Sequence, residues 1–175
     1  MSSSKAHGSF TPFQTHPWPS THTILSTLTY LVFWGDTKYL EDLIAWIRVP
    51  NLNSLNVWFF TDFLPVFPQL YNFISSAERF KWLKWAFVEL YPWSARITLG
   101  SLTSFDLGTR CDGLDQQVLW IAQLCRGHSL LLSQVESLEI SGDMDSQVEL
   151  QDSMEALQWL DLFRPFIAVQ GLYIL

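Results

Sequence analysis

Asn51-Leu-Asn-Ser-Leu-Asn-Val-Trp-Phe-Phe60 is the stretch of sequence that decides the expected fold. Its apolar residues Leu52, Leu55 and Val57 are separated mostly by asparagine and serine, a spacing typical of the strand in a leucine-rich-type repeat. The same apolar-x-x-apolar-x-apolar spacing returns, at intervals of 22 to 34 residues, at Leu28/Leu31/Phe33, Phe80/Leu83/Trp85, Leu102/Phe105/Leu107, Val135/Leu138/Ile140 and Val169/Leu172/Ile174. These triplets predict a recurring strand.

Helical patterns alternate with these triplets. Apolar residues recur at helical spacing in residues 39–47, 65–77, 114–125 and 151–163, between capping residues, glycines and prolines. Residues 79–99 fit a helix or a strand, and Ala86, Val88 and Leu90 favour a strand over 85–90. Residues 97–108 predict a strand pair or one long strand bent at Gly100. The fold class expected is therefore α/β, an irregular leucine-rich-repeat-type solenoid in which helices back a curved parallel sheet.

The 175 residues fit one domain preceded by a tail. Residues 1–22 are rich in Ser, Thr and Pro, a composition that predicts disorder. Residues 23–175 form the predicted repeat domain. This domain ends on an apolar strand without the polar cap that a solenoid needs, which predicts truncation at its C-terminus.

The charge balance and the cysteines narrow the function classes. Ten basic against seventeen acidic residues give a net charge of -7, which argues against broad binding to nucleic-acid phosphates. The two cysteines, Cys111 and Cys125, fit no metal-ligand spacing, and the chain has neither a signal-peptide pattern nor an apolar run long enough to span a bilayer. We expect an intracellular protein, cytoplasmic or nuclear, that does not contact membranes.

No motif in the chain indicates catalysis. Glycine-rich phosphate loops, dinucleotide fingerprints and the nucleophile elbow are all missing, and three of the four histidines lie in the predicted tail. The acidic residues around Asp143 and Asp145 lack the glycine and the twelfth-position glutamate of a calcium loop, so a solvated loop is the better interpretation. We expect no enzyme activity, no cofactor and no metal site.

The stretch from Arg79 to Arg96 interleaves cations with tryptophans. This pattern also suits a single-stranded nucleic-acid platform or a membrane-surface patch. Tryptophans packed in the core with lysines in solvent explain the same pattern. Nucleic-acid or membrane-surface binding through residues 79–96 therefore stays an alternative.

Several stretches resemble a large group of fungal F-box-like proteins with degenerate leucine-rich repeats. They include Val49-Pro-Asn-Leu-Asn-Ser-Leu55, Arg164-Pro-Phe-Ile-Ala-Val169 and longer segments at residues 28–43, 68–75 and 157–169. The resemblance implies a solenoid whose concave surface captures a protein for a cullin ubiquitin ligase. An F-box would dock on the Skp-type adaptor, but residues 1–22 are too short to hold one, so this contact requires a longer form of the protein. A truncated or non-functional paralogue is a further alternative.

The expected function is protein binding through the concave strand face, to a partner that the sequence does not identify. The exposed positions between the inward apolar residues supply the candidate contacts, and aromatic residues among them are the expected anchors. The candidate partner-binding residues are Tyr30, Asn53, Asn56, Trp58, Asp106, Glu136, Glu139 and Tyr173.

Overall fold

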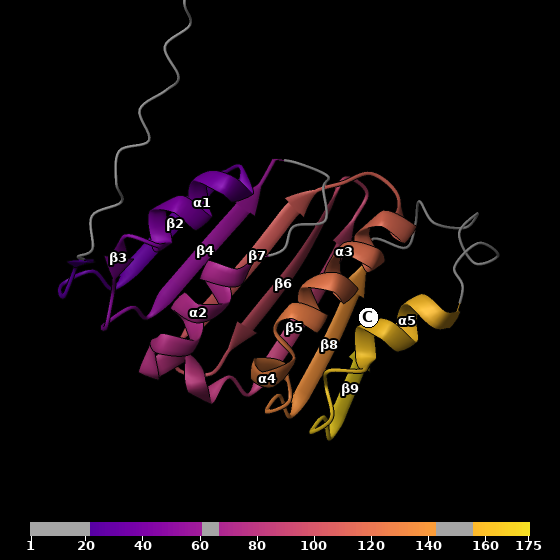
Figure 1. The fold of residues 1–175 in the computed structure, drawn as a ribbon. Helices are drawn as coiled ribbons and strands as arrows, with labels where there is room; N and C mark the ends of the chain where they lie inside the picture. The colour runs from indigo at the N-terminus through magenta and orange to yellow at the C-terminus, as the bar shows by residue number, and fades with distance from the viewer. Residues whose placement is uncertain (1–21, 61–66, 143–155) are drawn as a thin grey trace, which may run out of the picture.

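The computed structural model describes residues 22–60, 67–142 and 156–175, and in it seven strands form one mixed sheet (Figure 1). Along the chain these strands are β2 (Tyr30–Gly35), β4 (Ser54–Phe59), β5 (Trp85–Tyr91), β6 (Ser94–Gly100), β7 (Ser104–Arg110), β8 (Ser137–Gly142) and β9 (Gly171–Ile174). Two short strands pair separately, β1 (Thr23–Ile24) and β3 (Ile47–Arg48). The helices are α1 (Thr37–Ile44), α2 (Pro68–Ser76), the 3-10 helix η1 (Glu78–Trp82), α3 (Leu114–Gly127), α4 (Ser129–Leu132) and α5 (Ala156–Phe163).

The order of the strands shows that the predicted leucine-rich-repeat solenoid is wrong. The order across the sheet is β2-β4-β7-β6-β5-β8-β9, whereas a solenoid adds strands in chain order. In addition, β6 runs antiparallel to both of its neighbours, β5 and β7, while the other neighbouring pairs are parallel. The chain passes from β4 to a distant position at β5 and then returns through β6 and β7.

Two tight turns explain this departure. Tyr91 pairs with Ser94 across a two-residue turn, and Gly100 pairs with Ser104 at the other end of β6. Connections this short cannot carry the crossover that parallel neighbours need, so they force an antiparallel arrangement. The segment expected as a strand pair or one bent strand is therefore two strands, β6 and β7.

The predicted triplets nevertheless fall on six of these strands. Their second and third apolar positions lie on the helix side in five cases, for example Leu55 and Val57, both 0% exposed. The triplet that ends at Trp85 is the exception, because Trp85 is 39% exposed and Ala86, Val88 and Leu90 are buried instead. The register predicted by Ala86, Val88 and Leu90 is thus confirmed, and the triplet register at Trp85 is wrong.

The helices pack over one side of the sheet and form the core with it (Figure 1). The Glu41 carboxylate of α1 accepts hydrogen bonds from the backbone N–H groups of Gln69 and Leu70, each at 2.9 Å, and so caps the start of α2. The Gln117 side chain of α3 donates to the backbone oxygens of Tyr91 and Cys111 at 2.6 and 3.2 Å. These contacts fix α2 against α1, and α3 against the ends of β5 and β7.

Three sequence predictions concern residues that the structure leaves largely undescribed. The tail predicted over residues 1–22 lies outside the described residues except at His22. The acidic segment from Asp143 to Glu155 lies outside them completely, as does the first part of the helix predicted at 151–163. The described part of that helix is α5.

Candidate binding surface

The two sides of the sheet differ in what covers them. On the helix side, Leu55, Val88 and Leu107 are each 0% exposed. The opposite side, here called the open face, carries no helix among the described residues (Figure 1). Strand alternation and register place the following residues on it: Tyr30, Val32, Trp34, Ser54, Asn56, Trp58, Trp85, Phe87, Glu89, Tyr91, Ser94, Arg96, Thr98, Gly100, Ser104, Asp106, Gly108, Arg110, Ser137, Glu139, Ser141, Gly171 and Tyr173.

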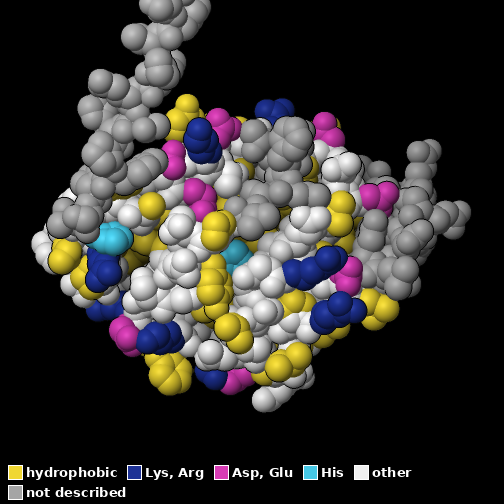
Figure 2. Space-filling model, viewed as in Figure 1, with side chains coloured by type: hydrophobic (Ala, Val, Ile, Leu, Met, Phe, Trp, Pro, Cys, Tyr) yellow, Lys and Arg dark blue, Asp and Glu magenta, His cyan; other side chains and the backbone are white. Residues whose placement is uncertain are grey.

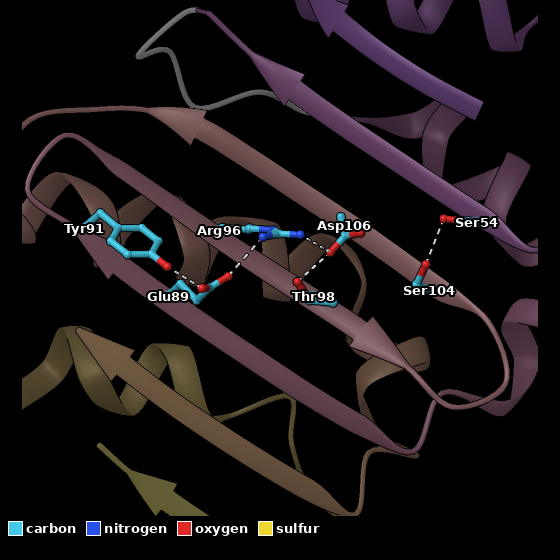
Figure 3. Close-up of polar contacts among 7 residues, drawn as sticks. All are labelled: Ser54, Glu89, Tyr91, Arg96, Thr98, Ser104 and Asp106. Carbon is cyan, nitrogen blue, oxygen red and sulfur yellow. Dashed lines mark hydrogen bonds and ion pairs between the residues drawn. The ribbon is translucent and has the colours of Figure 1, made fainter. Parts of the chain in front are cut away.

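A polar network lies at the centre of the open face, on β5, β6 and β7 (Figure 3). Arg96 donates to Asp106 at 3.0 Å and to Glu89 at 3.4 Å. Thr98 donates to the same Asp106 oxygen at 2.6 Å, and Tyr91 donates to Glu89 at 2.6 Å. That hydrogen bond to the Glu89 carboxylate raises the pKa of the Tyr91 phenol, because it stabilises the protonated form.

The network joins β5, β6 and β7, three strands that follow one another in the chain. Asp106 is only 7% exposed although it lies on the uncovered side of the sheet. A second polar contact links Ser54 of β4 to Ser104 of β7, with 2.8 Å between the two hydroxyl oxygens (Figure 3). Since buried polar groups are stabilising only when they are paired, these contacts specify which strands are neighbours.

Tryptophan rings lie flat over glycines on both sides of this network. A Cβ atom added to Gly108 would come within 2.9 Å of the Trp58 ring, and one added to Gly100 would overlap the Trp85 ring. The two glycines therefore provide the space in which these rings lie against the backbone of the neighbouring strand. The rings are held in place while part of their surface remains accessible, since Trp58 is half-buried and Trp85 is exposed.

The β2 edge of the open face is apolar. Tyr30, Val32 and Trp34 alternate along β2 and are 56%, 43% and 68% exposed. In the sheet register Trp34 is next to Trp58. These residues form a contiguous apolar strip, which is the kind of surface that marks an interaction site rather than a scattered exposure of single side chains.

On the helix side, the apolar residues Leu172 and Ile174 of the edge strand β9 are 50% and 68% exposed, and Leu160 of α5 is 61% exposed. Figure 2 views the molecule from this side, and there hydrophobic, basic and acidic side chains are interspersed over the helices. The largest exposed aromatic side chains of the strands lie on the other side, on β2, β5 and β9.

The structure brings six of the eight predicted contact residues together on the open face. They are Tyr30, Asn56, Trp58, Asp106, Glu139 and Tyr173. The other two lie just before β4 and β8, and each contacts a cation: Asn53 accepts from Arg79, and Glu136 pairs with Lys84. The sequence prediction missed Val32, Trp34, Trp85, Phe87, Glu89 and Arg96. Continuing the two-residue alternation along each strand would have found them.

Ion pairs argue against the alternative that residues 79–96 bind nucleic acid. Lys81 pairs with Glu78 at 2.6 Å, Lys84 pairs with Glu136, and Arg96 is held by Glu89 and Asp106. Arg79 is bonded to the Asn53 amide. Because acidic side chains neutralise three of these four cations, the segment does not present the basic groove that phosphate binding uses.

The buried titratable groups on the helix side do not form an activated pair. His128 donates from Nδ1 to the Leu124 carbonyl at 2.9 Å, and burial lowers the pKa of its imidazole. Burial raises the pKa of the Cys125 thiol, which disfavours the reactive thiolate. Among the described residues, no group of three His, Cys, Asp or Glu side chains is placed to hold a metal ion.

Comparison with known proteins found no similar protein. The chain matches no protein-family model, no curated protein and no solved structure. Within the described residues, no helix combines the length and the apolar character needed to cross a membrane.

Proposed function

We propose that this chain is a protein-binding module that holds its partner on the open face of the sheet. The observation that supports this proposal is the apolar strip of Tyr30, Val32 and Trp34 beside the immobilised Trp58 ring. Tryptophan and tyrosine are enriched among the residues that dominate binding energies, particularly where they are already fixed before binding.

A protein partner suits the surface better than a nucleic acid. The open face combines aromatic side chains with a central network that contains two carboxylates and one guanidinium. Interfaces between proteins are enriched in aromatic residues and arginine and contain a limited number of direct hydrogen bonds, features that the open face shares. Nucleic-acid surfaces instead require an excess of cations.

The F-box-like resemblance supplies a proposed setting for this binding. In that setting the partner is a protein presented for ubiquitination, and contact with a Skp-type adaptor requires a longer form that carries an F-box. An immunoblot of native cell extract, with an antibody against residues 109–128, tests this setting. A band well above 20.3 kDa supports a longer form, and a band at 20.3 kDa favours binding without adaptor recruitment.

Site-specific photo-crosslinking tests the binding surface itself. Trp34, on the open face, and Trp82, in η1, are 68% and 66% exposed and so form a matched pair. Each is replaced, in separate cells, by the photoreactive amino acid benzoylphenylalanine. We expect a discrete crosslinked protein only from position 34, and the same protein, once purified, must bind the unmodified chain. Crosslinking that is equal at both positions would contradict the proposal.

A further inference from the structure

This inference deepens the proposed function and rests on it: the charges of the open face specify the chemistry of the partner. The central network contains two carboxylates, Glu89 and Asp106, and a single guanidinium, Arg96, so one negative charge is in excess. Glu139 on β8 adds another. Among the described residues, the Glu139 side chain makes no hydrogen bond or ion pair, and Glu139 is half-buried.

The neighbours of Glu139 are aromatic on both sides. In the sheet register Glu139 lies between Phe87 of β5 and Tyr173 of β9. Neighbouring strands are about 4.8 Å apart, so both side chains flank the carboxylate on the same face. The Tyr173 ring lies over Gly171, where an added Cβ would be 3.1 Å from it, and 56% of Tyr173 is exposed.

A carboxylate between aromatic side chains favours one kind of ligand. The faces of aromatic rings attract cations, and a carboxylate adds a direct charge partner with hydrogen-bond acceptors. The nearby cations do not oppose this, because Lys84 pairs with Glu136 and Arg96 is held inside the network. Among the described residues of the open face, Arg110 at the end of β7 is the exposed cation, and it lies four strands from β9 in the sheet order.

From this arrangement we infer that the open face binds a basic segment of a partner protein, with a lysine or arginine side chain of that segment placed at Glu139 between Phe87 and Tyr173. Apolar residues of the same segment would lie against Trp85, two residues before Phe87 on the same face. Charge complementarity favours a basic segment as the ligand, since the chain itself carries a net charge of -7.

The test uses a random dodecapeptide library, displayed on phage and selected on the purified full chain. The enriched peptides should contain lysine or arginine well above the library frequency. A synthetic consensus peptide should then bind Glu139→Gln at least about fivefold more weakly than the unaltered chain, as is typical when one partner of a charge pair is removed. Glu139→Lys should weaken binding further, and a peptide in which the basic residue is changed to glutamate should recover part of that loss.

The control removes an equal charge elsewhere. Glu78 lies in η1, its side chain is 79% exposed, and Glu78→Gln should leave peptide affinity within about twofold. Thermal melting of each variant checks that the fold is retained.

The outcomes separate this inference from the proposed function. Selection that yields no enriched peptides, or peptides without basic residues, overturns the inference. It is also overturned if Glu139→Gln binds as tightly as the unaltered chain while Trp85→Ala weakens binding, a result that leaves the open face as the binding surface. If neither variant weakens binding, the peptide occupies another surface and the proposed function fails as well.

Discussion

Asp106 shows how single residues stabilise the open face. Asp106 is 7% exposed, and its carboxylate accepts hydrogen bonds from Arg96 and Thr98 through one oxygen. An ionised group that is this buried is costly unless it is paired, and removing one partner leaves the other uncompensated. The network should therefore respond strongly to the loss of a single member.

We predict that Arg96→Met lowers the free energy of unfolding by about 1–3 kcal/mol, because Asp106 loses its charge partner. The double variant Arg96→Met/Asp106→Leu should recover part of this loss, since it removes the isolated carboxylate. Urea denaturation followed by tryptophan fluorescence measures both values. As a control, Lys81→Met breaks an exposed pair with Glu78 and should change the free energy by less than about 0.5 kcal/mol. Equal effects of Arg96→Met and Lys81→Met would refute the importance of the network.

His128 gives a second prediction at the same scale. Burial lowers the pKa of its imidazole in the folded chain, so below the ordinary value of about 6.5 the unfolded chain binds a proton that the folded chain does not. The stabilisation from neutral His128 is complete above that value and is lost as the pH falls below it. We expect the free energy of unfolding to decrease between pH 7.5 and 5.5.

His128→Asn should flatten this pH dependence, because asparagine can donate a hydrogen bond near the Nδ1 position but does not titrate. His22 is exposed and serves as the control, so His22→Asn should keep the pH dependence of the unaltered chain. Denaturation curves at closely spaced pH values make the comparison. An unchanged slope in His128→Asn would show that another group is responsible.

At the scale of the elements, the sequence predicted the positions of the strands more reliably than it predicted which strands lie next to each other in the sheet. Apolar alternation defined the strands around Leu55, Phe105 and Leu138 and the side on which they are buried, because burial on one face imposes a period of two. This two-residue period carries no information on the direction of a strand or on its position in the sheet. The information on direction lay in the two turns that flank β6, at residues 92–93 and 101–103, which are too short for a crossover.

The predicted contact residues show the same division. Tyr30, Asn56 and Trp58 could be placed on one face from alternation alone. The proximity of Arg96, Glu89 and Asp106 was missed, because it depends on β6 being a separate strand that runs antiparallel to both β5 and β7. The packing of the tryptophan rings against glycines could not be predicted from the sequence either, since the contact of Trp58 with Gly108 joins strands that are distant in the sequence.

A disulfide tests the order of the elements. Ser54 and Ser104 are register partners on the neighbouring strands β4 and β7, and their hydroxyl oxygens are 2.8 Å apart. Neighbouring strands bring Cα atoms to about 5 Å, within the range that a disulfide spans. We predict that Ser54→Cys/Ser104→Cys forms a disulfide on mild oxidation.

Thiol titration of the denatured protein, before and after oxidation, measures this bond. The native thiols of Cys111 and Cys125 are buried in the folded chain and become accessible on denaturation, so they should titrate in both samples. The sequential order of a solenoid would place a third strand between residues 54 and 104 and keep them about 10 Å apart. Full recovery of all four thiols after oxidation would therefore argue against the observed order.

For the whole molecule, the unequal covering of the sheet is the feature that bears on function. The helices α1 to α5 cover one side, and the open face has aromatic rings packed against glycines around a central network of ion pairs and hydrogen bonds. The intracellular location and the ubiquitin-ligase setting stay predictions from the sequence. The open face supports a narrower statement, that a partner protein binds there.

The affinity of the crosslinked partner for matched tryptophan variants tests this statement most directly. Isothermal titration calorimetry would compare Trp34→Ala and Trp58→Ala, on the open face, with Trp82→Ala in η1. We predict that each open-face variant weakens binding by about tenfold or more, as for residues that anchor an interface, and that Trp82→Ala stays within about twofold of the unaltered chain. Unchanged affinity in both open-face variants, with the fold retained, would contradict the claim that the open face is the binding surface.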